Sequence, residues 1–377
     1  MEFIVSSADL LAQLNTIKGV ISSKNTMAIL DNFLFTLDGN TLKIEATDLE
    51  TRLEARMTLD NVKGGGVVAI DAKKLVEILS SYSDEPLTFK IDLTAYKVDI
   101  LSASGGCHIP AVSGEDFPKT MPLSDTEDNP KVSFSVSPSV LQKGLASVVF
   151  ATADDETRPI LTGILCELTN EHFRMVATDS HKLARYTRTD VKSEKNASFI
   201  LPKKPASLLK GILAKESNDV LVEFDSKQLV LTMSSYVLGC RLIEGRYPNY
   251  AAVIPSENPC KLLINKDEFA KKLHRVSLFS NPANNLTRLE MSGSRLLISA
   301  QNIDFASSAK EELTCRYEGD EMQIGFKSKF LETILNNINS EEVGLEMSDP
   351  MRASLIIPVD KEDENEDVLM LLMPMQI

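Results

Sequence analysis

The sequence has little of what an enzyme or a metal protein requires. It contains no tryptophan, 6% aromatic residues and four histidines among 377 residues. No histidine stands in HExxH or HxH spacing, and neither GxGxxG nor a GxxxxGK loop followed by Ser or Thr occurs. The scarcity of aromatic side chains argues against base-stacking platforms, so any DNA contact would be directed to the backbone and blind to sequence. We therefore expect no catalytic residues, no metal and no cofactor.

Long apolar runs and paired cysteines are also missing. No stretch approaches 18 consecutive apolar residues, and Met1 to Val5 contain no basic region ahead of an apolar run, so we expect neither a membrane span nor a secretory signal. The cysteines are odd in number, widely spaced and without a CxxC motif: Cys107, Cys166, Cys240, Cys260 and Cys315. This pattern predicts reduced, mostly buried thiols in a cytoplasmic protein.

Positive charge is in short supply as well. Lys and Arg number 40 against 54 Asp and Glu, which gives a net charge of −14. Taken alone, that balance argues against a protein that binds nucleic acid or an anionic membrane, because both require a positive surface. The total says nothing about how the charge is distributed, however. With 43% hydrophobic and 25% charged residues, the length fits two or three globular domains.

What the sequence does contain is a threefold internal repeat. An offset of 131 residues places Ala46-Thr47-Asp48 on Ala177-Thr178-Asp179. The apolar residues Phe3, Val5, Leu10, Leu14 and Ile17 fall on Phe134, Val136, Leu141, Leu145 and Val148 at that offset, and on Leu262, Ile264, Phe269, Leu273 and Val276 at 259 residues. Three copies of about 126 residues account for the length. We predict domains at residues 1–122, 131–253 and 257–377.

Each copy combines helices with strands. Alternating apolar residues open the copy, and Leu10, Leu14, Ile17 and Ile21 then follow helical spacing. Short β-branched runs come next, and Asp38-Gly39-Asn40 between two of them predicts a hairpin turn. The predicted fold class is α+β, with two helices packed on antiparallel sheets in each domain. The six helices are predicted over residues 7–22, 72–81, 137–152, 203–216, 265–279 and 327–338.

Charge is sorted by secondary structure. The six predicted helices carry a net charge of +8, which leaves −22 for the rest of the chain. One explanation is that Lys favours helices and solvates their exposed faces. The other is a positive surface lined by helices on an otherwise acidic protein, which would attract phosphates. Equivalent helices in three repeats would lie on a common surface, and this favours the second explanation.

Three segments allow more than one interpretation. Asp154-Asp155-Glu156 could hold a metal or serve as a carboxylate site, although an exposed acidic loop explains it more simply. The acidic run 361–367 is interpreted as a solvated loop between strands. The apolar end, residues 368–375, contains three methionines, which either fill a core or line a groove that accepts varied peptides.

Four separated segments resemble a known family. They are residues 157–163 (TRPILTG), 177–184 (ATDSHKLA), 244–250 (EGRYPNY) and 373–375 (MPM). In this order, they are similar to the bacterial DNA polymerase III β subunits, the sliding clamps. The resemblance spans the whole chain and includes its length and its three-unit plan.

The resemblance implies a ring. Two chains would associate head to tail as a homodimer and enclose duplex DNA, with helices lining the hole and sheets forming the rim. The implied function is to tether the polymerase, not to catalyse a reaction. The implied partners are duplex DNA of any sequence, the DNA polymerase III catalytic subunit, the clamp loader complex, and other clamp-binding polymerases and repair proteins, with no membrane.

The resemblance also implies a partner groove between the second and third domains. We call this groove the partner groove. Its walls would be formed by Leu161, Thr178, His181, Leu183, Pro248, Val253, Phe330, Leu371, Met373, Pro374 and Met375. Most of these residues are apolar, as an anchor pocket for a peptide requires. Ser180 and Lys182 stand where the family often has Gly and Arg, and Gln376 stands where Arg is common.

DNA contact and ring closure are assigned to further residues. Lys24 and Arg158 lie in loops where the family places basic contacts, and the positive helices add others, so that the predicted DNA-contact residues are Lys24, Arg158, Lys203, Lys204, Lys210, Lys271, Lys272 and Arg275. The ring joint should pair Cys107 and Ile109 with Leu278 and Phe279, although packing in the core would explain these four nearly as well.

A different class of function would fit the same groove. A monomeric adaptor would bind peptides through its methionine-rich end without enclosing DNA. Sedimentation at the mass of a single chain would favour that alternative.

Overall fold

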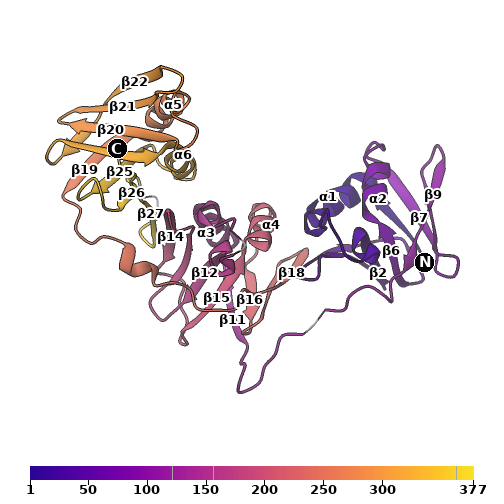
Figure 1. Cartoon of the computed structure of the whole chain (residues 1–377). Helices are drawn as coiled ribbons and strands as arrows, with labels where there is room; N and C mark the ends of the chain where they lie inside the picture. Colours follow the sequence, from indigo (N-terminus) through magenta and orange to yellow (C-terminus); the bar gives the residue numbers. More distant parts are fainter. Residues whose placement is uncertain (121, 156, 362) are drawn as a thin grey trace. The chain divides into compact units, whose positions relative to one another are not determined.

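The computed structural model describes residues 1–120, 122–155, 157–361 and 363–377, and the chain divides into two compact units (Figure 1). The first unit comprises Met1–Ser139 and Ser207–Leu242, and the second comprises Val140–Ala206 and Ile243–Ile377. Each unit takes a part of the second repeat, because one sheet in each unit joins strands of neighbouring repeats.

The first unit contains two antiparallel sheets. A five-stranded sheet has the order β5 (Val62–Lys63), β1 (Glu2–Ser6), β7 (Pro86–Asp92), β8 (Lys97–Leu101) and β9 (Gly106–Pro110). A nine-stranded sheet has the order β10 (Val112–Ser113), β6 (Gly66–Asp71), β2 (Asn32–Asp38), β3 (Thr41–Thr47), β4 (Thr51–Thr58), β18 (Tyr236–Arg241), β17 (Gln228–Thr232), β16 (Val220–Phe224) and β11 (Val132–Val136). The antiparallel pairing of β4 with β18, which we call the first joint, links the first repeat to the second.

The second unit follows the same plan. Its nine-stranded sheet has the order β15 (Ala197–Pro202), β12 (Gly163–Leu168), β13 (Phe173–Thr178), β14 (Lys182–Arg188), β27 (Glu366–Leu372), β26 (Ser354–Pro358), β25 (Glu342–Met347), β19 (Cys260–Asn265) and β23 (Arg316–Glu318). A four-stranded sheet has the order β22 (Ser307–Thr314), β21 (Arg295–Asn302), β20 (Leu286–Ser292) and β24 (Met322–Lys327). The pairing of β14 with β27, the second joint, links the second repeat to the third.

All six predicted helices are present, and their ends are trimmed. They are α1 (Ser7–Ile17), α2 (Ala72–Leu79), α3 (Pro138–Val148), α4 (Lys203–Leu213), α5 (Lys266–Ser277) and α6 (Ser328–Asn336). The Ser6 side chain accepts a hydrogen bond from Asp9 N at 3.1 Å, which fixes the start of α1. Short 3-10 turns, Lys18–Val20 and Val149–Ala151, replace the expected last turns of α1 and α3.

The predicted patterns bury the expected side chains. Leu10, Leu14 and Ile17 on α1 are all fully buried, in agreement with their helical spacing. The hairpin turn is also confirmed, since Asp38 pairs with Thr41 across β2 and β3 and Gly39 has a φ of 54°. Four cysteines are buried, and Cys107 is partly exposed. In the described part of the chain, the helices are too short or too polar to cross a membrane.

Candidate partner groove and DNA-contact residues

The rim of the partner groove is built on a turn between β13 and β14. Thr178 Oγ1 donates to Lys182 O at 2.8 Å and accepts from Ser180 N at 3.1 Å. The Asp179 carboxylate accepts from His181 N and from Lys182 N, each at 2.9 Å. These bonds hold Ser180 at a φ of 79°, a conformation that residues other than glycine adopt infrequently. The turn therefore has one defined shape, and it leaves the His181 side chain exposed.

Three of the predicted groove residues are buried together and would form its floor. Leu161, Leu183 and Leu371 belong to one buried cluster in the second unit. Leu183 and Leu371 are cross-strand partners in the second joint, so the ladder that links the repeats also supports the floor. Tyr250 completes the cluster, and its hydroxyl group contacts Glu167 at 2.5 Å and Arg174 at 3.1 Å.

The end of the chain forms one side of the groove. Met373 N donates to His181 O at 2.9 Å, and Met375 N donates to Gly325 O at 2.8 Å. The backbone approaches Gly325 closely, since a Cβ atom there would lie 2.8 Å from Met375 O. Met373 is exposed, whereas Pro374 and Met375 are half-buried. The methionine-rich end therefore lies beside the turn and is not wholly used as core.

An aromatic ring on α6 completes this side of the groove. The rings of Phe330 and His181 stack, with their centroids 5.8 Å apart. The ammonium groups of Lys182 and Lys327 lie 4.7 and 4.6 Å from the centre of the Phe330 ring. Lys182 is buried and pairs with Asp179, so its charge is satisfied inside the protein. Here Lys182 stabilises the turn rather than presenting a free cation at the rim.

All eleven predicted groove residues belong to the second unit. Leu161, Leu183 and Leu371 are buried, Thr178, Phe330, Pro374 and Met375 are half-buried, and His181, Pro248, Val253 and Met373 are exposed. Pro248 and Val253 flank the buried Tyr250, since Tyr250 N donates to Pro248 O at 2.7 Å and Val253 ends the short turn that Tyr250 begins. A buried apolar floor with an exposed rim suits an inserted side chain.

The predicted DNA-contact residues are distributed over both units, and several have acidic partners. Lys24 and Lys210 belong to the first unit, and the other six belong to the second. Lys203 Nζ lies 2.6 Å from the Asp154 carboxylate, and Lys272 Nζ lies 2.8 Å from that of Glu268. Arg275 Nε lies 2.8 Å from Glu311 on β22. Lys24, Lys204, Lys210 and Lys271 have exposed side chains.

Arg158 has an unexpected position. Its guanidinium group donates to Ser180 Oγ at 2.9 Å and to Asp155 Oδ2 at 3.0 Å. The predicted DNA contact thus adjoins the turn of the partner groove, and its charge is partly satisfied by Asp155.

The contacts of Arg158 and Lys203 also bear on the alternative that Asp154-Asp155-Glu156 is a carboxylate site. Lys203 lowers the pKa of Asp154, and hydrogen bonds from Thr157 and then Arg158 lower the pKa of Asp155, so both groups stay ionised and neither is suited to general acid work. Glu156 lies outside the described residues.

The four predicted joint residues differ in exposure. Leu278 and Phe279, which follow α5, are 70% and 42% exposed. Cys107 on β9 is partly exposed, whereas Ile109 on the same strand is 6% exposed and packs into the first unit. The sequence analysis missed two further features: β9 and β22 are outer strands, each at the end of a sheet. Whether a strand lies at the edge of a sheet depends on its pairing with distant strands, so the local sequence pattern could not predict it.

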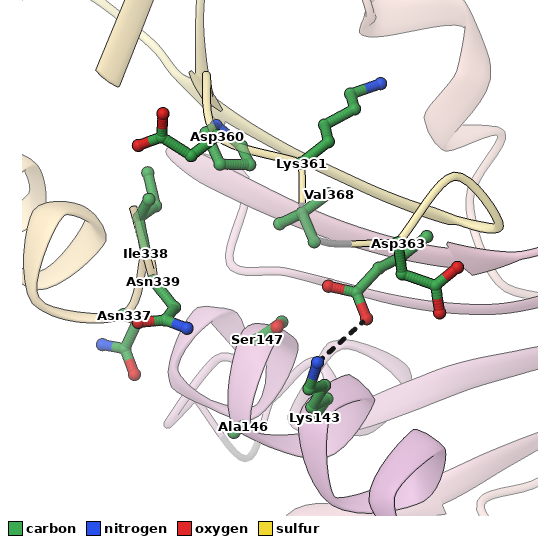
Figure 2. Close-up of a pocket in the computed structure, with 12 residues that line it drawn as sticks. Lys143, Ala146, Ser147, Asn337, Ile338, Asn339, Asp360, Lys361, Asp363 and Val368 are labelled. Atoms are coloured by element: carbon green, nitrogen blue, oxygen red, sulfur yellow. Dashed lines mark ion pairs between the residues drawn. The ribbon is translucent and has the colours of Figure 1, made fainter. Parts of the chain in front are cut away.

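A second pocket, of about 160 Å³, lies between α3, α6 and residues 358–368 (Figure 2). Lys143 on α3 approaches Glu366 at 3.9 Å there. Behind the pocket, Arg188 donates to Asp190 and to Asp363, and Tyr186 Oη donates to Glu366 at 3.0 Å. The two aspartates raise the pKa of Arg188. Two of the acidic groups that line this pocket, Asp363 and Glu366, are thus engaged with the arginine and tyrosine of β14.

This network corrects the interpretation of the acidic run. Residues 361–367 were expected to form a solvated loop, yet Asp363 and Glu366 pair with Arg188, and Asp367 pairs with Arg185 at 2.8 Å. Glu366 and Asp367 begin β27 and lie in the second joint. Glu362 lies outside the described residues. Part of the run is thus held by the arginines of β14.

Comparison with known proteins identifies the family. The family models for the N-terminal, central and C-terminal domains of the DNA polymerase III β subunit match residues 1–122, 135–249 and 251–376. The β sliding clamp of Pseudomonas aeruginosa is 27% identical over all of both chains, and that of Proteus mirabilis is 29% identical over 93% of this chain and 94% of its own.

Solved structures agree with these matches. A sliding clamp from Pseudomonas aeruginosa bound to griselimycin has a TM-score of 0.93 at 25% identity, and one from Bartonella birtlesii, also bound to griselimycin, has a TM-score of 0.91 at 26% identity. Both cover the full length of each chain. The expected three-domain α+β clamp fold is confirmed. The chain belongs to the DNA polymerase III β subunit family, the β sliding clamps, which serve that polymerase in DNA replication as non-catalytic processivity factors.

Proposed function

We propose that two copies of this chain close head to tail into a ring around duplex DNA, slide along it in the cytoplasm, and tether the DNA polymerase III catalytic subunit through the partner groove. Each copy contributes three domains, at residues 1–122, 131–253 and 257–377. The clamp loader complex, other clamp-binding polymerases and repair proteins use the same groove. DNA is held by enclosure, without regard to sequence.

The equivalence of strands between repeats carries this proposal. In the first and second joints, the third strand of one hairpin series (β4 or β14) pairs with the third strand of another (β18 or β27). The equivalents that remain are β22, which follows β20 and β21, and β9, which follows β7 and β8. Both are edge strands in the described chain. Pairing β22 of one copy with β9 of the next would create a third nine-stranded sheet.

An open strand edge is a structural liability unless something covers it. Unpaired backbone groups along an edge attract other strands, and most proteins blunt or bury such edges. Because β9 belongs to the first repeat and β22 to the third, two copies pair both of these edges at once and leave neither of them open. We call this pairing between chains the third joint. The exposed Leu278 and Phe279 supply apolar surface for it.

Weak phosphate contact suits a protein that slides. Ion pairs between exposed side chains contribute about 0–1 kcal/mol, so Arg275 and Lys272 can exchange their acidic partners for phosphates with little loss of free energy. Their carboxylate partners prevent tight, static binding. The enclosure supplies persistence, and the cations supply guidance.

The partner groove supports the tether. Its buried leucine floor accepts an apolar side chain, and the flexible thioethers of Met373 and Met375 adapt to peptides of different shape. Partners with different sequences would therefore compete for one groove.

The decisive experiment is retention on DNA of two topologies. The full chain is loaded by its clamp loader onto nicked circular DNA and washed at a salt concentration that abolishes ordinary phosphate binding. We expect it to remain on the circle and to leave once a restriction enzyme linearises the same molecule. Equal retention on both forms would refute enclosure. Sedimentation at 41.6 kDa would instead favour a monomeric adaptor.

A further inference from the structure

The turn that supports the partner groove occurs a second time, between β3 and β4 of the first unit. Thr47 Oγ1 donates to Thr51 O at 2.9 Å and accepts from Leu49 N at 3.1 Å. The Asp48 carboxylate accepts from Glu50 N at 3.1 Å and from Thr51 N at 2.7 Å. Leu49 has a φ of 78°, against 79° for Ser180. The repeated Ala-Thr-Asp motif thus builds the same scaffold twice, bond for bond.

The side chains on the two scaffolds differ in chemistry. In the second joint, Leu183 faces Leu371 across the ladder, and both are buried and apolar. In the first joint, the equivalent pair is Arg52 and Gly239. Two residues beyond Gly239, Arg241 takes the place that Met373 has two residues beyond Leu371, since Arg241 N donates to Glu50 O as Met373 N donates to His181 O. Where the partner groove has an apolar floor, the first unit therefore carries two arginines and a glycine.

A pocket of about 240 Å³ occupies this place in the first unit. We call it the cationic pocket, and its defining side chains are Leu49, Glu50, Arg52, Pro118, Lys119 and Arg241. Three of them are cations and one is an anion. The position of the pocket follows from the scaffold, since Pro118 ends the motif that repeats at Pro248 of the partner groove.

Arg52 is held rigidly in this pocket. Its Nε donates to the Glu45 carboxylate at 2.7 Å, and its Nη1 donates to Pro118 O at 2.5 Å. The guanidinium group also lies 5.5 Å from the centre of the Phe117 ring. Its Nη2 has no hydrogen-bond partner among the described residues. Arg241, in contrast, is 61% exposed and only loosely paired with Glu50 at 3.8 Å. The pocket therefore combines one fixed guanidinium with one that is free to turn toward a ligand.

We propose that the cationic pocket binds an acidic side chain, Asp or Glu, from a peptide segment of a protein that is docked on the clamp. The inference extends the proposed function, since it gives partners of the ring a second point of attachment. Guanidinium groups bind carboxylates in a planar, two-pronged manner. Leu49, exposed on the strained turn, offers apolar contact to the residue beside the acid.

A peptide fits this pocket better than a nucleic acid does. The volume suits one or two side chains and is below the range of about 300–1,000 Å³ typical of larger ligands. A DNA backbone presents a row of phosphates and needs a row of cations. Here Glu50 stands at the turn and would repel the neighbouring phosphates.

The test uses the full-length dimer and two short probes. The first is acetyl-Gly-Leu-Glu-Glu-Leu-amide, and the second is the same peptide with both Glu replaced by Gln. Methyl NMR signals of Leu49, Leu229 and Val230, which line the pocket, report binding. We expect saturable shifts with the Glu peptide, at a dissociation constant of about 1 mM, and none with the Gln peptide.

Variants of exposed residues locate the effect. Arg241→Gln and Lys119→Gln should each weaken binding of the Glu peptide about threefold to fivefold, and the double variant about tenfold or more. Lys63→Gln, an exposed lysine of the first unit outside the pocket, is the matched control and should leave binding unchanged. Arg52 is left intact because its removal would strand the nearly buried Glu45.

Three results would overturn the proposal: equal shifts with the Gln peptide, equal shifts with a duplex oligonucleotide of similar charge, or no shift at 10 mM peptide. These outcomes are separable from failure of the proposed function. If the ring proposal holds and the pocket proposal fails, the double variant and the wild type both stay on circular DNA and do not differ in their response to the Glu peptide. If the ring proposal fails, the clamp leaves circular DNA, whereas the methyl shifts remain.

Discussion

The first and second joints use the same backbone ladder and very different side chains. In the first joint, Leu53 faces Leu238, and the ion pair between Arg241 and Glu50 is long and exposed. In the second joint, Arg185 and Arg188 on β14 meet acidic residues on β27 and before it. The comparison shows that continuity of the sheet, and not any particular side-chain chemistry, defines how the repeats connect. Each joint is then free to acquire its own character.

The largest effect is expected at the third joint, where the proposed sheet would continue between chains. Leu278→Asp combined with Phe279→Asp places two charges where the proposal expects apolar burial, which is worth about 1.5–3 kcal/mol for each side chain. We expect the dissociation constant of the dimer to rise more than about 100-fold. Sedimentation equilibrium should then report 41.6 kDa at micromolar concentration.

A matched control separates this effect from general disruption. Met351 is 68% exposed and lies outside the proposed joint, so Met351→Asp should leave the dimer intact. A double variant that stays dimeric would remove Leu278 and Phe279 from the interface.

The second way concerns the groove at the end of the second joint. Removing Met373 to Ile377 takes away the terminal segment that is bonded to His181 O and Gly325 O, while β27 and its ladder remain. A labelled peptide from the polymerase catalytic subunit should no longer bind, whereas the dimer should persist. Removal of Ile377 alone, as the control, should retain binding. Unchanged affinity after the longer truncation would show that the partner groove is assigned to the wrong residues.

A third prediction compares how much one arginine of each joint contributes to stability. Arg188→Ala leaves three carboxylates without their cation, and we expect a loss of about 2–3 kcal/mol in the free energy of unfolding of the second unit, somewhat below a fully buried pair because the carboxylates are partly exposed. Arg241→Ala in the first joint should lose less than about 0.5 kcal/mol. Urea unfolding monitored by hydrogen exchange in each unit measures both. Equal losses would mean that the two joints do not differ as the geometry indicates.

The smallest expected effect is a dependence of the free energy of unfolding on pH. The side chain of Arg188 lowers the pKa of Asp190, and the Asn365 backbone N–H together with Arg188 lowers the pKa of Asp363. Groups with a lowered pKa in the folded state stabilise it above their unfolded pKa and lose that contribution as the pH falls. The difference in stability between wild type and Arg188→Ala should thus be full above about pH 5 and shrink toward pH 3. A constant difference would contradict the assignment.

Much of the fold could be read from local patterns, because apolar spacing and turn residues act over short distances. The spacing of Leu10, Leu14 and Ile17 predicted α1, and Asp38-Gly39-Asn40 predicted the hairpin between β2 and β3. The alignment of Ala46-Thr47-Asp48 with Ala177-Thr178-Asp179 indicated the internal repeat, and the turn that each segment builds came only from the structure. The residues of the partner groove followed from family resemblance, and their assignment stays a prediction.

The remaining features depend on partners far apart in the sequence. The helix charge was counted correctly, yet Glu311 on β22 lies beside Arg275, and Asp154 lies beside Lys203. No local pattern predicts such pairs, because the fold alone brings the two residues together. For the same reason, the acidic run was interpreted as a solvated loop although Arg188 engages part of it. Ile109 alternates with exposed residues on β9, and its burial depends on what the sheet packs against.

The duplicated turn has an evolutionary consequence. In both copies its shape depends on a threonine and an aspartate that hydrogen-bond to the backbone of their own loop, and none of these bonds uses the side chain at the tip. After a gene segment is copied, those tip positions are free to diverge while the loop keeps its form. Leu49 and Ser180 have the same backbone conformation and share no side-chain chemistry. A chain assembled from such copies gains new surface specificities through single substitutions, without having to evolve a new fold for each one.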